Sequence, residues 1–390
     1  MSANKPPFDG ECKRVKLNDI AVVKAGNVAP KKDDFSKIGT PFVRAGSLTS
    51  LLAGGMLSDL ELIDEPTAQK LRMTLFPEGT VVFAKSGMSC MTGNVYVLPE
   101  PCYVVSHLAC VIPVGDYAVY LKHYFRSNRP SKLVENPSFP SIRLSKIQNM
   151  ELEIPVRSEM EKQVRSLEHI ESLIEWSKEQ IAMLDTLVKS RFVEMFGGLN
   201  STDLRPLKDV CSIITDGTHQ PPKFVDRGIP FLFVSNITSD AIDYETNKFI
   251  SVEDYEQLIR RTPIEVGDVL VSAVGSFGHP AIVEDDRPFC FQRHIAYLKP
   301  RHDLIDSSYL HAALLSEGSQ RYMDRCAKGA AQRTVTLKSF KEMKVPLPPL
   351  ALQQEFASFV AEVDKSRFIV KQKIEKLQML YDSLAQEYFG

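Results

Sequence analysis

The chain contains two copies of one sequence pattern, and this duplication constrains its fold more than any other feature. The stretch from Ser158 to Gly197 has the apolar spacing of one long helix and ends in EMFG, while the last residues of the chain form a second such stretch that ends in EYFG. Gly197 and Gly390 are separated by almost half of the 390 residues. A repeat of this kind has to be recognised first, because overlooking it leads to the wrong fold.

Five further landmarks occur in the same order in both halves, and the offset between partners changes by only a few residues. They are LNDIAVVKAGN and LKDVCSIITDG, GTPFVRAGSL and GIPFLFVSNI, FPEGTVVFAKSG and IEVGDVLVSAVG, SHLACVIP and RHIAYLKP, and IRLSKIQNMELEIP and VTLKSFKEMKVPLP. The sequence therefore predicts a tandem, pseudo-two-fold repeat. Its expected parts are globular domains over residues 1–155 and 198–346, each followed by a helix, over 156–197 and 347–390.

Each globular part combines strand-like and helical runs. TVVFA, DVLVSAV, YVVSHLACVIP and FCFQRHIAYLKP are rich in β-branched and aromatic residues and are bounded by Gly, Pro or Asp, which is typical of strands. TAQKLRM and SYLHAALLSEGSQRYMDR favour helices. We therefore expect an α+β fold with mixed α/β domains.

The two long helices carry apolar residues mostly at spacings of three and four, which favours an amphipathic seam. One alternative is that each helix packs only on its own domain. However, a helix of about 39 residues is about 58 Å long, longer than such a domain is wide, so pairing of the helices is preferred. The predicted seam residues are Ile174, Ile181, Leu184, Val188, Val363, Val370, Ile374, Leu377 and Leu384, and Arg367 interrupts the second helix.

The short connection Gly198–Asp203 indicates the direction of this pairing. It reaches only about 20 Å, so the second domain should lie at the far end of the first helix. The second helix then returns antiparallel, as in a coiled coil, and the domains occupy opposite ends of a rod.

Composition and motifs argue against an enzyme active site. The chain is 44% hydrophobic and 25% charged, as in folded soluble proteins, and its polar start does not resemble a signal peptide. Its apolar runs are too short for a membrane span, and its seven scattered cysteines indicate a reduced, cytoplasmic protein. No GxGxxG, Walker A, GxSxG or HExxH motif occurs.

Local charge and small polar loops point to nucleic acid instead. Lys122–Lys146 contains six basic residues and one acid, and the equivalent Arg321–Lys344 contains seven and two, although such clusters are also found on solvated faces. The loops KSGMSCMTGN, SAVGSFGH, RAGS and VSNI follow apolar strands and could approach phosphates or base edges, although each could be a simple tight turn. The candidate DNA-contacting residues are Arg44, Ser47, Lys85, Ser86, Ser89, His107, Arg126, Arg143, Ser235, Asn236, Ser272, Ser276, Arg293, His294, Arg325, Gln332 and Arg333.

Together these features resemble the specificity subunit of type I restriction–modification enzymes. The resemblance lies in the tandem halves, PFVRAGSL and PFLFVSNI, GTVVFAKSG and GDVLVSAVG, SHLA and RHIA, VPLPPLALQQEFA, and the EMFG and EYFG helix ends, and it covers nearly the whole chain. The first copy departs from it by having VRSEMEKQ where a proline-rich entry is expected and by lacking the arginine of RHIA.

The resemblance implies a non-catalytic chain in which each domain reads one half of a bipartite double-stranded DNA target. The helices would fix the gap and dock two methyltransferase subunits, and restriction subunits would join the complex. No cofactor is expected on this chain, whereas S-adenosylmethionine, ATP and Mg²⁺ are expected in the partner subunits. A protein-binding coiled-coil scaffold and the recognition half of a fused methyltransferase or nuclease are the alternatives.

Overall fold

The structure, a computed structural model, describes residues 12–198, 203–220, 222–238, 241–329 and 332–390, and these form two compact units. Unit 1 comprises the chain up to Ser177 together with Gln372–Gly390, and unit 2 comprises Lys178–Lys371. The long helices α6 (Arg157–Phe196) and α12 (Leu350–Phe389) each contribute a segment to both units. Each unit therefore combines one globular domain with parts of both helices.

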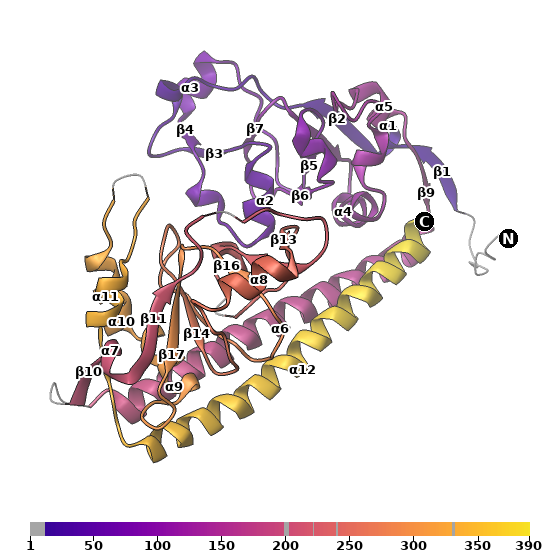
Figure 1. Ribbon diagram of the computed structural model, residues 1–390. Coiled ribbons are helices and arrows are strands. Elements are labelled where there is room, and N and C mark those ends of the chain that lie inside the picture. Colours follow the sequence, from indigo (N-terminus) through magenta and orange to yellow (C-terminus); the bar gives the residue numbers. More distant parts are fainter. Residues whose placement is uncertain (1–11, 199–202, 221, 239–240, 330–331) are drawn as a thin grey trace. The chain divides into compact units, whose positions relative to one another are not determined.

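Unit 1 is built around a four-stranded sheet in the order β2 (Ala21–Ala25), β8 (Leu108–Pro113), β5 (Val81–Ala84) and β6 (Val95–Val97) (Figure 1). All four residues of the inner strand β5 are buried, which explains its uninterrupted apolar sequence VVFA. The edge strand β2 alternates between buried and exposed positions at its start.

Two smaller sheets and five short α-helices complete the globular part of unit 1. The sheets are β4 (Leu62–Ile63), β3 (Thr40–Val43) and β7 (Tyr103–Val104), and β1 (Lys13–Lys16) with β9 (Glu151–Ile154). The helices are α1 (Leu17–Ile20), α2 (Ser47–Leu52), α3 (Glu65–Lys70), α4 (Ala118–Ser127) and α5 (Leu144–Gln148).

Unit 2 repeats these sheets strand by strand. Its four-stranded sheet is β11 (Cys211–Asp216), β17 (Ile295–Pro300), β14 (Val269–Ser272) and β15 (Pro280–Ile282); the smaller ones are β13 (Phe249–Ile250), β12 (Ile229–Leu232) and β16 (Cys290–Phe291), and β10 (Leu204–Pro206) with β18 (Lys344–Pro346). Its helices are α7 (Leu207–Val210), α8 (Val252–Leu258), α9 (Ser307–Leu315), α10 (Glu317–Cys326) and α11 (Leu337–Glu342). The tandem mixed fold expected from the duplication is thus confirmed.

The strand prediction around the two repeated histidines was wrong in one respect. YVVSHLACVIP and FCFQRHIAYLKP are each broken by a turn, and the two strands on either side belong to different sheets. β7 pairs in parallel with β3, whereas β8 pairs with β2 and β5. His107 and His294 therefore lie in turns that connect two sheets rather than inside strands.

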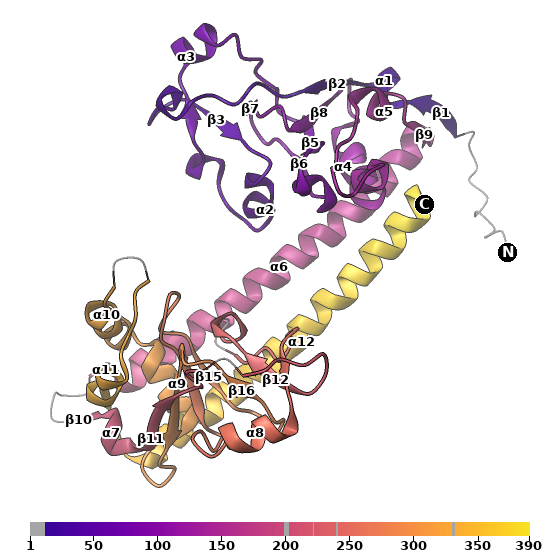
Figure 2. The same cartoon turned by 45° about the horizontal axis from the view of Figure 1, so that its top comes forward.

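Within each unit, the segments of α6 and α12 run antiparallel, as predicted, and lie side by side in both views (Figure 2). In unit 1, Leu167 and Ile170 of α6 form a buried cluster with Tyr381 and Ala385 of α12. In unit 2, Phe192 of α6 packs against Phe356 at the other end of α12. In unit 1 the first part of α6 thus contacts the end of α12, and in unit 2 the end of α6 contacts the first part of α12.

The predicted seam residues are all buried or half-buried. Val363 is buried, and Ile174, Leu377 and Leu384 pack around the buried cluster of unit 1, while Val188 packs on the core of unit 2. The others, Ile181, Leu184, Val370 and Ile374, are half-buried. The predicted reach of the connection after α6 concerns residues 199–202, which lie outside the described residues.

Charged residues interrupt the seam in unit 2. Arg191 of α6 reaches Glu355 of α12 at 3.3 Å, and Arg367 of α12 reaches Asp185 of α6 at 2.8 Å. Arg367, which breaks the apolar pattern of the sequence, is therefore accommodated by an ion pair between the two helices. No helix in the described part of the chain is long and apolar enough to cross a membrane.

A buried polar group anchors α4 to both long helices in unit 1. A 2.8 Å hydrogen bond joins His123 Nδ1 to the Tyr381 hydroxyl of α12. Lys122 and Arg126, on the same helix, both pair with Glu171 of α6. Burial, then the charges of Lys122 and Arg126, lower the pKa of His123 to about 2, so its imidazole is neutral at ordinary pH.

Candidate nucleic-acid interface

Three chain segments that are distant in sequence meet beside the histidine turn of unit 1. The backbone N–H of Lys85, just after β5, donates to the His107 carbonyl at 2.9 Å. Ile142 N–H donates to the Lys85 carbonyl at 2.7 Å, and Gly87 N–H donates to the Pro140 carbonyl at 3.0 Å. We call these segments, residues 85–87, 106–107 and 140–142, loop cluster 1.

The same hydrogen bonds recur in unit 2 between equivalent residues. Ala273 N–H donates to the His294 carbonyl at 2.9 Å, Val335 N–H to the Ala273 carbonyl at 2.8 Å, and Gly275 N–H to the Arg333 carbonyl at 2.9 Å. Residues 273–275, 293–294 and 333–335 are loop cluster 2. The predicted glycine loops, the histidine turns seen in the structure and parts of the basic segments are thus brought together twice.

A fourth segment joins each cluster from the end of the first strand of the main sheet. Ser106 N–H donates to the Asn27 carbonyl at 2.6 Å, and Arg293 N–H donates to the Thr218 carbonyl at 3.0 Å. The preceding residue is glycine in both copies because the backbones touch there: a Cβ on Gly217 would lie 2.1 Å from the Phe291 carbonyl oxygen.

The side chains presented by this common frame differ between the copies. In loop cluster 1, the Ser86 hydroxyl and His107 Nδ1 share a 2.8 Å hydrogen bond, and the His107 ring is exposed. Arg143 follows directly and is also exposed, with no ion-pair partner among the described residues. A serine, a histidine and an arginine can together offer donors and acceptors to base edges or phosphates.

Loop cluster 2 carries more positive charge. Arg293 is exposed, and burial, followed by the charge of Arg293, lowers the pKa of the neighbouring His294. Arg333 pairs with Asp324 at 2.7 Å and lies over the Phe277 ring at 5.2 Å. Beside them, Gln332 and Ser276 are exposed, and the Ser276 hydroxyl shares a 3.1 Å hydrogen bond with His279.

Several predicted contact residues lie away from the loop clusters. Arg44 pairs with Glu61 at 2.6 Å and also lies over the Phe35 and Phe42 rings. Arg126 is held by Glu171 of α6, so its charge is used inside unit 1. The remaining ones are Ser47 at the start of α2, Ser89 in a short 3₁₀ helix, Ser235 in another, and Arg325 on α10.

Two predicted contact residues are corrected by the structure. The Asn236 side chain is buried, donates to the Asp243 and Glu245 carbonyls, each at 2.9 Å, and accepts from Phe233 N–H. Ser272 is fully buried, and its hydroxyl oxygen accepts from His279 N–H at 2.9 Å. Both side chains are satisfied internally, which removes them from the set that can reach a ligand.

The basic segments are also less positive than their sequences suggest. In the first, Lys122 and Arg126 are engaged by Glu171, and Lys146 pairs with Glu135. In the second, Arg321 pairs with Glu317 and Arg333 with Asp324. The basic residues without an ion-pair partner in the described chain are Arg129, Lys132, Arg143, Arg325, Lys328, Lys338, Lys341 and Lys344.

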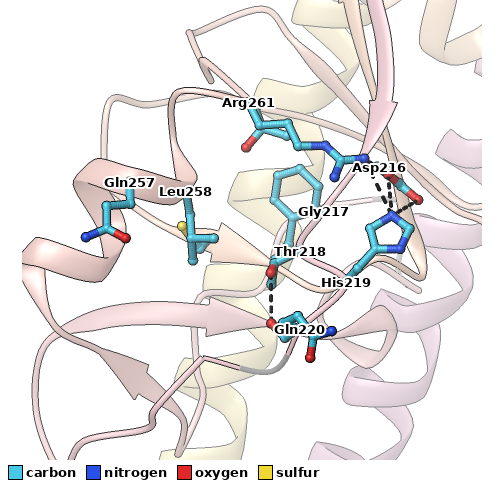
Figure 3. Close-up of a pocket in the computed structure, with 11 residues that line it drawn as sticks. Asp216, Gly217, Thr218, His219, Gln220, Gln257, Leu258 and Arg261 are labelled. Atoms are coloured by element: carbon cyan, nitrogen blue, oxygen red, sulfur yellow. Dashed lines mark hydrogen bonds and ion pairs between the residues drawn. The ribbon is translucent and has the colours of Figure 1, made fainter.

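A polar pocket beside loop cluster 2 was missed by the sequence reasoning (Figure 3). Figure 3 shows Arg261 and His219 pointing toward Asp216, at 2.7 Å and 3.1 Å from its carboxylate. The pocket has a volume of about 300 Å³, and buried Cys290 and Phe291 contribute apolar lining. Its signal in the sequence was that Asp216 and His219 of TDGTHQ align with the apolar Ala25 and Val28 of KAGNVA in the first copy.

The chain is similar to known proteins over most of its length. A family model, the type I restriction modification DNA specificity domain, matches residues 10–185 and again 202–379. The type I restriction enzyme EcoBI specificity subunit of Escherichia coli is 29% identical over 160 residues, covering 41% of this chain and 33% of that protein. A putative MjaX specificity subunit of Methanocaldococcus jannaschii is 26% identical over 193 residues, covering 48% and 45%. The chain spans less than half the length of these two curated relatives.

Solved structures agree with the fold. The S subunit of a type I restriction–modification system from M. genitalium matches with a TM-score of 0.50 and 14% identity, over 99% of this chain and 98% of that one. A chain solved in a study of complex assembly and conformational transition of the type I R-M system matches with a TM-score of 0.53 and 18% identity, over 98% and 99%.

Proposed function

Because the chain belongs to the type I restriction modification DNA specificity domain family, we propose that it is the DNA-specificity subunit of a type I restriction–modification complex. Each globular domain reads one half of a split double-stranded DNA target. The observation that carries the proposal is the repetition of one loop cluster, with the same backbone hydrogen bonds and different side chains. A frame of this kind lets two domains dock in the same way and read different bases.

Reading would combine phosphate anchoring with contacts to base edges. Exposed Arg143 and Arg293 are suited to phosphates or guanine, and the Ser86–His107 pair supplies a donor and an acceptor at the same edge. The chain itself would carry out no chemistry. Methyl transfer from S-adenosylmethionine would belong to two methyltransferase subunits, and ATP- and Mg²⁺-dependent cleavage to restriction subunits, within the cytoplasm.

The test is to express the chain with its methyltransferase partner and to map the methylated motif in cells. His107→Ala is expected to alter only one half of the motif, and Arg293→Ala only the other half. His169, exposed on α6, and Arg301, which follows the far end of β17, provide matched control substitutions to alanine that should leave the motif intact. An unchanged motif in both test variants would contradict the proposal. A wild-type complex that does not discriminate between DNA sequences would favour a protein-binding scaffold.

The paired helices would set the gap between the two half-sites. Inserting seven residues after Ala182 in α6 and seven after Val370 in α12 preserves the seam and adds about 10.5 Å of helix. The unread gap should then grow by about three base pairs at roughly 3.4 Å each, while the bases read remain the same. New bases at an unchanged spacing would contradict the proposal that the paired helices set the gap.

A further inference from the structure

The pocket of unit 2 shown in Figure 3 contains three charged or polar side chains that contact one another. Asp216, with 14% of its side chain exposed, accepts from Arg261 Nη2 at 2.7 Å and from His219 Nε2 at 3.1 Å. The Arg261 and His219 side chains are themselves 54% and 50% exposed. A nearly buried carboxylate thus holds two half-exposed donors at the mouth of the pocket.

The internal repeat identifies the counterparts of these three residues. Gly26 and Gly217 make the same close contact with the strand that precedes the histidine turn, so Asp216 corresponds to Ala25 and His219 to Val28. Arg261 corresponds to Met73 by the offset that relates Gly79 to Gly267. All three polar residues of unit 2 are therefore replaced by apolar ones in unit 1, although the backbone frame is retained.

The position of the pocket connects it to the reading surface. Thr218, which follows the pocket glycine, accepts a backbone hydrogen bond from Arg293 of loop cluster 2 and forms a parallel bridge with Gln292. The pocket and loop cluster 2 are therefore joined directly through the backbone. The three side chains change between the copies as a group, and Arg261 and His219 are each about half exposed, so both can meet a ligand.

The chemistry of the three side chains favours one base. Asp216 is occupied by its two donors, so its carboxylate is not free, and the exposed guanidinium of Arg261 presents donors only. In the major groove, guanine offers two adjacent acceptors, O6 and N7, and the planar guanidinium of arginine matches both. Adenine and thymine each offer only one acceptor there, N7 and O4, and cytosine offers none.

We infer that Arg261, held in place by Asp216 and assisted by His219, selects a G·C pair at one position of the half-site read by the second domain. This inference rests on the proposed function, because it concerns how that function chooses its sequence. Asp216 is a positioning residue in this scheme: it orients the guanidinium but does not touch the base.

The experiment uses the full chain assembled with its methyltransferase partner, and methylated sites are mapped in cells for Arg261→Met, which installs the residue of the first copy. Discrimination for guanine at one position of one half-site is expected to fall about tenfold to a hundredfold. The other half-site and the gap should not change. Arg260→Met is the matched control, since Arg260 is an exposed neighbour with the same charge.

The outcomes separate this inference from the function on which it rests. A wild-type complex without sequence preference overturns the proposed function itself. A specific wild-type motif that has no G·C pair in the second half, or that is unchanged in Arg261→Met, overturns only the inference. Should Arg261→Met fail to assemble, Asp216→Ala and His219→Val must relax the same position, and an unchanged preference in both refutes the inference.

Discussion

The neutral, buried His123 should make unit 1 sensitive to mild acid. Its ring contacts Tyr381 of α12, and Glu171 of α6 is 3.9 Å from Nδ1, close enough to favour a charged imidazole. Burial and the positive charges of Lys122 and Arg126 outweigh that carboxylate and lower the pKa of His123 to about 2. Unfolding exposes the ring and restores a value near 6.5.

The sign and size of the effect follow from proton linkage. Below pH 6.5 the unfolded chain binds a proton that the folded chain does not bind, so the free energy of unfolding falls as the pH is lowered. The slope is about 1.4 kcal/mol per pH unit once the unfolded ring is protonated. Between pH 6.5 and about pH 4.5, the loss from His123 alone is about 2.3 kcal/mol.

Urea unfolding followed by tryptophan fluorescence provides the assay. Trp176, the only tryptophan of the chain, lies on α6 within unit 1 and so reports on this unit. The wild type and His123→Gln are compared across this pH range, with His169→Gln as a control on the exposed face of α6. Carboxylates distant from residue 123 contribute equally to all three proteins, so the difference in slope reports on His123 and its contact with Glu171.

The expected result is that His123→Gln loses about 2 kcal/mol less than the wild type between the two pH values, while His169→Gln behaves like the wild type. Equal pH dependence in His123→Gln and the wild type would refute the reasoning, because the ring would then have a similar pKa in the folded and unfolded states.

Gly217→Ala should destabilise unit 2 by roughly 3 kcal/mol, because the new Cβ would lie 2.1 Å from a backbone oxygen of β16. The melting temperature of this variant should fall, whereas Gly46→Ala, which has open space around the new Cβ, should melt like the wild type. Replacing Arg367 and Asp185 with leucine, singly and together, should give a coupling free energy of about 0.5 kcal/mol by urea unfolding, because Asp185 is half exposed; zero coupling would mean that the ion pair between the helices is not stabilising. Arg143→Ala in the assembled complex should reduce the slope of log binding constant against log salt concentration by about one, and an unaltered slope would show that this residue touches no phosphate.

Sequence reasoning worked where the signal was periodic or repeated. The apolar spacing along the two long helices predicted their antiparallel pairing, and most of the strand-like runs formed the inner strands of the two main sheets. It was less reliable for single side chains. Asn236 and Ser272 are small polar residues that follow or end an apolar strand, which is why they were predicted to contact DNA. In the structure their side chains are buried and form hydrogen bonds with backbone groups.

Sequence by itself determined that this chain is a duplicated unit with a long helix after each copy, because burial patterns and turn residues are local properties that survive in each half. Only the tertiary structure decided which polar residues act together. The residues of each loop cluster come from distant segments and meet through backbone hydrogen bonds, and Asp216 meets Arg261 from 45 positions away. Such long-range contacts depend on how the strands pair and where the chain turns, and a local sequence pattern does not contain this information. The polar pocket could therefore be identified only from the folded structure.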